Sequence, residues 1–82
     1  MNMSTDYPVA DLEVDASGLK CPLPILRAKK ALAQLEAGQV LKVITTDLHA
    51  VRDFKAFSEQ TGNALLLQSE SDGTAVHFLK RR

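Results

Sequence analysis

The chain has 82 residues, a length that suits one small domain with a two-layer core. Ten Lys and Arg side chains balance ten Asp and Glu side chains, so the formal net charge is zero and disfavours bulk electrostatic binding to nucleic acid or to a membrane surface. The sequence contains no apolar run long enough to span a bilayer, and its single cysteine cannot form an internal disulfide.

The chain begins with a polar segment, residues 1–8, which has neither the basic nor the apolar region of a signal peptide. We therefore expect a flexible N-terminal leader, followed by a single domain over residues 9–82. A lone cysteine in such a chain indicates a cytoplasmic protein with a free thiol and no direct membrane contact.

The N-terminal half of the domain predicts a strand and then a helix. Apolar and acidic side chains alternate over residues 11–16, which is typical of a half-buried strand. A helical pattern then runs from Pro22 or Pro24 to Ala37, with Gly38 as its stop. The apolar stripe expected to face the core comprises Ile25, Ala28, Leu32 and Leu35.

The C-terminal half predicts three strands and a second helix. Residues 39–46 are rich in β-branched side chains and indicate a strand. A helix follows with Asp47 as its N-cap and Gly62 as its terminator, and Phe54 and Phe57 lie at core spacing within it. An Asp-Gly turn joins two further strands, which we expect at residues 63–70 and 74–81.

The order of elements is therefore β-α-β-α-β-β. The first two strands flank a helix, so a right-handed crossover should make them parallel. Two helices can cover only one face of a four-stranded sheet. The expected fold is an α/β (α+β) two-layer sandwich, with a four-stranded mixed sheet and two helices on one face.

The cysteine lies between the first strand and the first helix. Gly18 turns the chain off the strand, and Pro22 favours an extended Cys21 at the N-cap of the helix. If the helix begins at Pro24 instead, Cys21 lies in the preceding turn. In both cases the positive end of the helix should favour a thiolate or a persulfide anion. Because the two prolines also remove amide donors, we hypothesise that the sulfur anion is weakly held and readily passed on.

The outer side of the first helix carries a candidate docking surface. Leu23 and Leu26 fall outside the predicted core stripe, close in sequence to the thiol. The basic side chains of this region could favour the sulfur anion and steer an acidic partner, or could belong to an ordinary solvated helix face. They are Lys20, Arg27, Lys29 and Lys30.

The two histidines do not predict a metal site. Their spacing from Cys21 matches no zinc pattern, and we expect no metal and no cofactor. His49 should be a solvated residue of the second helix's first turn, and His77 a strand residue on the less buried face. No aromatic side chains alternate with basic ones, which disfavours direct nucleic-acid binding.

The stretch from Asp15 to Leu32, DASGLKCPLPILRAKKAL, resembles the signature of the TusA/SirA-like sulfur-carrier family, a Cys-Pro-x-Pro motif after a Gly-Leu-x step. The resemblance extends over residues 11–80 and implies the same two-layer β-α-β-α-β-β sandwich. It also implies that Cys21 accepts sulfur as a persulfide from a cysteine desulfurase or rhodanese and relays it to a partner protein. Thiolation of tRNA wobble uridine is the best-known destination, and molybdenum cofactor assembly and sulfur oxidation are others. The family often has Asp-Pro where this chain has Asp47 and Leu48, which weakens assignment to one named member.

Two classes of function remain open from the sequence. The first is a sulfur carrier, a monomer that acts as a co-substrate of other enzymes rather than as an independent catalyst. The second is a non-enzymatic redox-sensing or regulatory module that uses the single thiol. An independent thiol enzyme is disfavoured, because the sequence indicates neither a general base nor a resolving cysteine.

Overall fold

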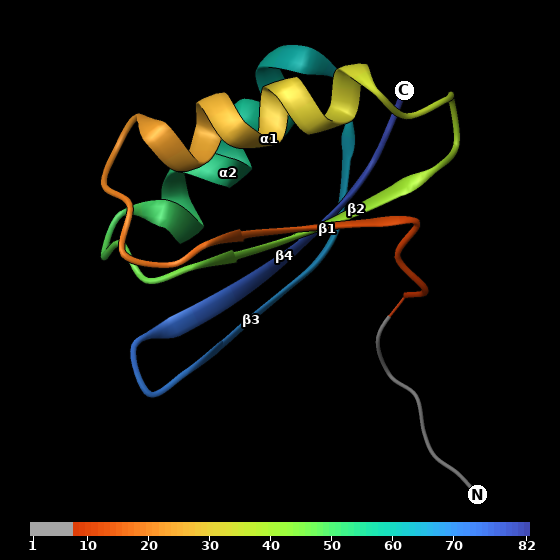
Figure 1. Cartoon of the computed structure of the whole chain (residues 1–82). Helices are drawn as coiled ribbons and strands as arrows, with labels where there is room; N and C mark the ends of the chain where they lie inside the picture. Colours follow the sequence, from red (N-terminus) through yellow and green to blue (C-terminus); the bar gives the residue numbers. More distant parts are fainter. Residues whose placement is uncertain (1–7) are drawn as a thin grey trace, which may run out of the picture.

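The computed structural model describes residues 8–82, which form four strands and two helices in the predicted β-α-β-α-β-β order (Figure 1). The expected leader falls, except for Pro8, outside the described residues. The elements are β1 (Leu12–Ala16), α1 (Leu23–Ala33), β2 (Val40–Thr45), α2 (Ala50–Thr61), β3 (Ala64–Ser71) and β4 (Thr74–Lys80). No helix within residues 8–82 has the length and apolar character needed to cross a bilayer.

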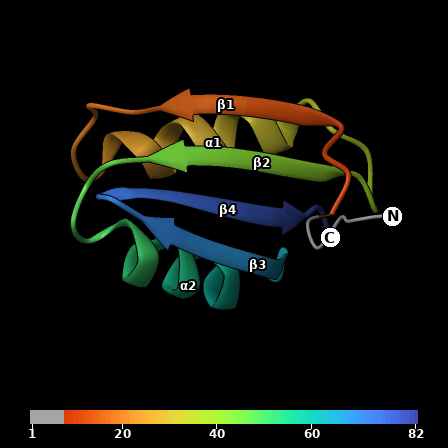
Figure 2. The same ribbon diagram turned by 90° about the horizontal axis from the view of Figure 1, so that it is seen from below.

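The strands form one mixed sheet in the order β1-β2-β4-β3. Strands β1 and β2 are parallel, as expected for strands joined by a helix, and β4 is antiparallel to both of its neighbours. Figure 2 shows both helices on the same side of this sheet. The predicted two-layer sandwich is therefore confirmed. Its topology brings the C-terminal ends of β1 and β2 to the same edge of the molecule.

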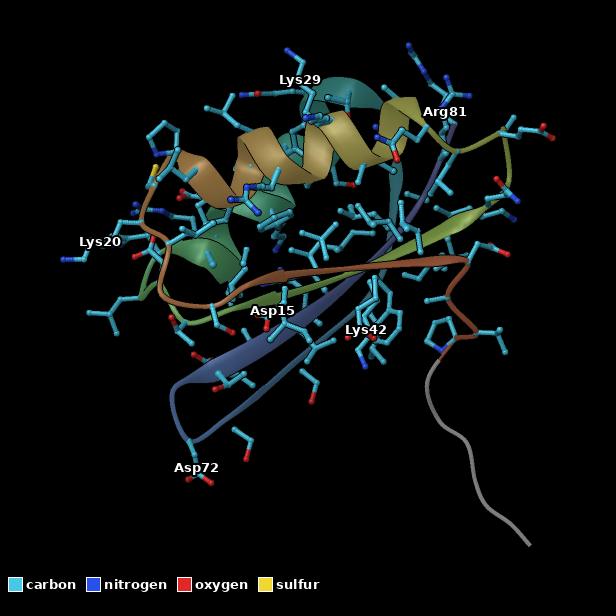
Figure 3. The ribbon with its side chains drawn as sticks, viewed as in Figure 1. Asp15, Lys20, Lys29, Lys42, Asp72 and Arg81 are labelled. Carbon is cyan, nitrogen blue, oxygen red and sulfur yellow. The ribbon has the colours of Figure 1, made fainter. Side chains whose placement is uncertain are left out.

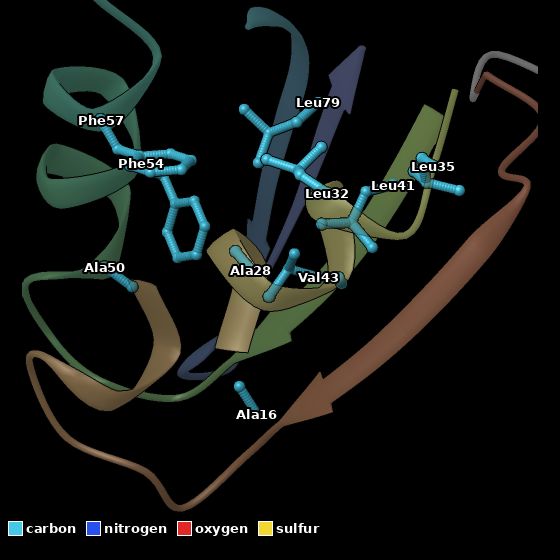
Figure 4. Close-up of a cluster of buried hydrophobic side chains, with 11 residues drawn as sticks. Ala16, Ala28, Leu32, Leu35, Leu41, Val43, Ala50, Phe54, Phe57 and Leu79 are labelled. Carbon is cyan, nitrogen blue, oxygen red and sulfur yellow. The ribbon is translucent and has the colours of Figure 1, made fainter. Parts of the chain in front are cut away.

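The core lies between the two helices and the sheet (Figure 4). Side chains of the strands alternate, so every second residue faces the helices. The predicted stripe of α1 is buried except for Ile25, which is half-buried against the core, and Pro24 and Ala31 are buried as well. The two phenylalanines of α2, Phe54 and Phe57, pack edge to face with ring centroids 6.2 Å apart, which confirms them as core residues.

The helix α1 is shorter than predicted at its C-terminal end. It ends at Ala33 rather than Ala37, and tighter turns follow, in which the amide of Leu35 donates to the carbonyl of Leu32 at 3.1 Å. Gly38 is not the helix stop. Its φ of +89° turns the chain toward β2, and its amide donates to the Arg81 carbonyl at 2.8 Å.

The predicted turns of the C-terminal half are present. Gly62 ends α2 in the left-handed conformation, with its amide donating to the Ser58 carbonyl. Asp72 and Gly73 both have positive φ, 53° and 81°, which is the geometry of a type I′ hairpin turn between β3 and β4.

The prediction for His77 is wrong. Its side chain is fully buried on the helix-facing side of β4, opposite Val43 of β2. The alternation of β4 explains this, because Ala75 and Leu79 share its face and are core residues. The ring stacks on Phe54 with a centroid distance of 4.5 Å, and burial lowers the pKa of His77 to about 4.

Candidate functional site

Cys21 is exposed in the loop that connects β1 to α1. Gly18 turns this loop with a φ of +79°, a conformation that glycine adopts without steric cost. The Ser17 amide donates to the Asp15 carboxylate at 3.0 Å, and the Gly18 amide donates to the Thr46 hydroxyl at 2.8 Å. The loop is therefore tied both to its own strand and to the end of β2.

The start of α1 differs from both predicted positions. Pro22 is the N-cap, so Leu23 is the first helical residue and Cys21 lies one residue before the cap. The Cys21–Pro22 peptide bond is cis. The Leu23 amide donates to the Lys20 carbonyl at 2.8 Å, and Pro24 in the first turn is buried against the core. Pro24 thus contributes to packing as well as to helix initiation.

The loop between β2 and α2 meets the thiol loop. The carboxylate of Asp47 accepts the Cys21 amide at 3.1 Å. The prediction that Asp47 is the N-cap of α2 is wrong, because His49 occupies that position. The His49 amide lies 3.5 Å from Asp47 Oδ1. A turn closed by the Ala50 amide on the Asp47 carbonyl separates the strand from the helix. The aspartate therefore bridges two loops rather than capping one helix.

Carboxylates, rather than cations, dominate the electrostatics of the thiol. A hydrogen bond with the Asp53 side chain, desolvation and the negative charges of Asp53 and Asp47 together raise the pKa of Cys21 above its ordinary value. Arg52 is the group that opposes them. The sequence predicted a favoured thiolate, so this part of the prediction is wrong. The groups that set the direction of this shift lie on the loop and helix that follow β2.

A cavity of about 520 Å³ opens beside the thiol. Both loops line it, and Leu48 at its rim is 89% exposed. The lining residues are Gly18, Leu19, Lys20, Cys21, Thr46, Asp47, Leu48 and His49. His49 is exposed, as predicted, and the described residues contain no group of three or more His, Cys, Asp or Glu that could hold a metal ion.

The residues predicted for docking are divided between two places. Leu23 and Leu26 are 47% and 52% exposed on α1, and Lys20 lines the thiol cavity. Arg27 and Lys30 instead line a separate hollow of about 400 Å³ between α1 and β1. Figure 3 shows Lys20 on the loop before α1, at one end of the molecule.

The sequence analysis does not predict that the loop after β2 meets the thiol loop. From the sequence, Asp47 is predicted only to cap a helix, Leu48 is only a departure from a family pattern, and no motif singles out Asp53. The topology contained a usable signal, because the C-terminal ends of neighbouring parallel strands share an edge and the loops that follow them converge there. The residues after β2 were thus candidates from the predicted fold alone.

Comparisons with known proteins identify relatives of the whole domain. The sequence model of the family described as "Sulfurtransferase TusA" matches residues 12–81. The sulfur carrier protein TusA of Allochromatium vinosum is 57% identical over 72 residues, covering 88% of this chain and 93% of the relative. A putative sulfur carrier protein of Neisseria meningitidis serogroup A is 63% identical over 60 residues, covering 73% and 81%. The crystal structure of a SirA-like protein from Desulfitobacterium hafniense superposes with a TM-score of 0.75 at 34% identity, covering 84% of this chain and 95% of that one.

Proposed function

The chain belongs to the TusA family of sulfur carriers, and from this premise we propose that Cys21 carries the sulfur as a persulfide. The position of Cys21 supports this proposal most directly. Its thiol is exposed beside a cavity where two loops meet. A carrier needs a reactive group that other proteins can reach. It does not need a second catalytic group of its own.

Loading of Cys21 would be a sulfur exchange without net oxidation. The Cys21 thiol loses its proton, and the thiolate attacks the terminal sulfur of a persulfide on the donor protein. A sulfur–sulfur bond forms on Cys21 while the sulfur–sulfur bond of the donor breaks, and the donor thiolate leaves and takes up a proton. Delivery to the acceptor cysteine is the same exchange in the next protein pair.

The carboxylates near the thiol keep the unloaded carrier in a less reactive form. Because Asp53 and Asp47 raise the pKa of Cys21, the unloaded side chain is mainly the protonated thiol rather than the thiolate. A partner that brings positive charge to the cavity would shift the balance toward the thiolate. We propose that loading is thereby favoured in the complex with the donor over reaction with small electrophiles in solution.

Partner proteins would dock around the cavity and on the adjoining face of α1. The exposed Leu23 and Leu26 offer apolar contacts next to the thiol, and Lys20 offers a cation at the cavity itself. Arg27 and Lys30 extend this surface toward β1 and would steer an acidic partner. Gly18, Pro22 and Pro24 would act by shaping the loop. A cysteine desulfurase or rhodanese is the proposed donor, and a sulfur-accepting protein in the cytoplasm, of a pathway such as tRNA wobble-uridine thiolation, is the proposed acceptor.

Intact-mass spectrometry tests the proposal. After incubation with a cysteine desulfurase and cysteine, the protein should gain the mass of one sulfur atom, and a thiol reductant should remove it. The Cys21→Ser variant, matched in size, should gain nothing. A parent protein that stays unmodified, or a serine variant that still gains sulfur, would contradict the carrier assignment. Oxidation of the parent without a sulfur adduct would favour the redox-sensing alternative.

A further inference from the structure

A buried polar cluster lies beneath the first turn of α2, in the core rather than at the thiol. Thr45 and His77 are fully buried on β2 and β4, and Gln68 of β3 is half-buried beside them. The His77 Nε2 atom lies 2.8 Å from Thr45 Oγ1, and His77 Nδ1 lies 3.0 Å from Gln68 Nε2. The Gln68 side chain also reaches the backbone carbonyl of Val51, at 2.9 Å. We call Thr45, Gln68 and His77 the His77 cluster.

The chemistry of the partners assigns the direction of every bond in the cluster. The Val51 carbonyl can only accept, so Gln68 faces it with its amide nitrogen. The same nitrogen has a second hydrogen, which it donates to His77 Nδ1. His77 is therefore neutral with its proton on Nε2, which donates to the Thr45 hydroxyl. A low pKa of His77 agrees with this tautomer, since protonation at Nδ1 would break the Gln68 bond.

The cluster connects to the thiol site through two short segments. Val51 lies in the first turn of α2, two residues before Asp53, whose side chain hydrogen-bonds with the thiol. Thr45 is the last residue of β2, two residues before Asp47, whose carboxylate accepts the Cys21 amide. Each carboxylate that faces the thiol thus lies two residues from a residue that the cluster holds by a hydrogen bond.

We propose that His77 and Gln68 are positioning residues, which hold the first turn of α2 and the end of β2 so that Asp53 and Asp47 face Cys21. The functional meaning of this assignment rests on the proposed carrier role. The buried location supports a specific role, because a polar cluster in a small core is costly unless every group is satisfied. Here the hydrogen bonds satisfy both ring nitrogens and connect three strands with α2.

The test measures the pH dependence of Cys21 alkylation by iodoacetamide, which requires no sulfur donor. Gln68→Leu removes the bond to Val51 at a half-buried position, and His77→Phe keeps an aromatic ring against Phe54 while removing both ring hydrogen bonds. In each folded variant we expect the carboxylates to be held less well. The alkylation rate at neutral pH should then rise several-fold, with the titration midpoint moving toward that of an ordinary cysteine.

Two controls separate positioning from general loosening of the fold. Leu35 is a core residue that follows the C-terminal end of α1, whereas the thiol precedes its start. Leu35→Ala should therefore destabilise the protein without changing the alkylation profile. In an Asp53→Asn background, Gln68→Leu should add little, because the carboxylate it positions is already gone. Unchanged alkylation in Gln68→Leu, or an equal change in Leu35→Ala, would overturn the inference. Failure of sulfur loading in the parent would instead count against the carrier role, and leave the alkylation result standing.

Discussion

The two ends of the molecule surround their cavities with different charges. At the thiol end, the cavity lining carries one anion, Asp47, and one cation, Lys20, and Asp53 hydrogen-bonds with the sulfur. At the opposite end, a cavity of about 340 Å³ lies beside the last turns of the helices. Its lining contains three basic side chains, Lys29, Arg81 and Arg82, and no Asp or Glu of the described residues. Figure 3 shows Arg81 and Lys20 at opposite ends.

This difference shows that charged residues near a nucleophile in sequence need not determine the electrostatic field at that nucleophile. Lys29 and Lys30 follow the cysteine closely along the chain, but the helix carries their side chains into two hollows away from the thiol. Asp53 is distant in sequence and reaches the sulfur through the fold. The thiol is therefore tuned by the loop and helix that follow β2, and the cationic end should not affect it.

A core substitution at the cationic end gives the largest expected effect on stability. Leu32 is buried and lines the cationic cavity. Leu32→Ala should lower the free energy of unfolding by about 3 kcal/mol, because truncation removes buried methyl groups and leaves a cavity. Urea denaturation would measure this loss. The alkylation profile of Cys21 in the folded variant should stay that of the parent, and a shifted profile would show that the two ends are coupled through the core.

An intermediate effect is expected from the titration of His77. Its pKa of about 4 in the folded protein lies below the ordinary value of 6.5, so between pH 6.5 and 4 the unfolded chain binds a proton that the folded chain does not. The free energy of unfolding should therefore fall as the pH is lowered through this window. The full shift corresponds to about 3 kcal/mol.

Denaturation curves at several pH values would measure this slope, with His77→Phe as the matched variant. The variant should lose the part of the slope that His77 contributes between pH 6.5 and 4. It should keep the part that comes from carboxyl groups such as Asp15, because hydrogen bonds from Ser17 lower the pKa of that carboxyl group. An identical slope in the two proteins would mean that His77 binds its proton over the same pH range in the folded and unfolded states, so that burial does not lower its pKa.

Local patterns predicted the fold well because each element carried its own signal. The alternation of residues 11–16, the Asp72-Gly73 turn and the Gly62 stop each depend on neighbouring residues, and each is present in the structure. The long-range contacts of the thiol could not be predicted in the same way. The pairing of Cys21 with Asp47 joins residues 26 positions apart, and it depends on how two loops meet at the edge of the sheet.

The smallest effect on the alkylation rate should come from replacing Arg52. The direction of that effect tests whether the charges near Cys21 act on its pKa as described above. The guanidinium is largely exposed and lies 3.9 Å from Asp53, and among the charges near the thiol it is the one that lowers the pKa of Cys21. Arg52→Gln should therefore slow alkylation at neutral pH, by less than about twofold, because exposed charges interact weakly. Added salt should reduce the difference from the parent, since screening acts first on exposed groups.

Asp53→Asn, one residue further on, should change the rate more and in the opposite direction. If both variants shifted the rate the same way, the carboxylate and the guanidinium would not be competing for one thiol. The raised pKa would then need a source other than the loop and helix that follow β2.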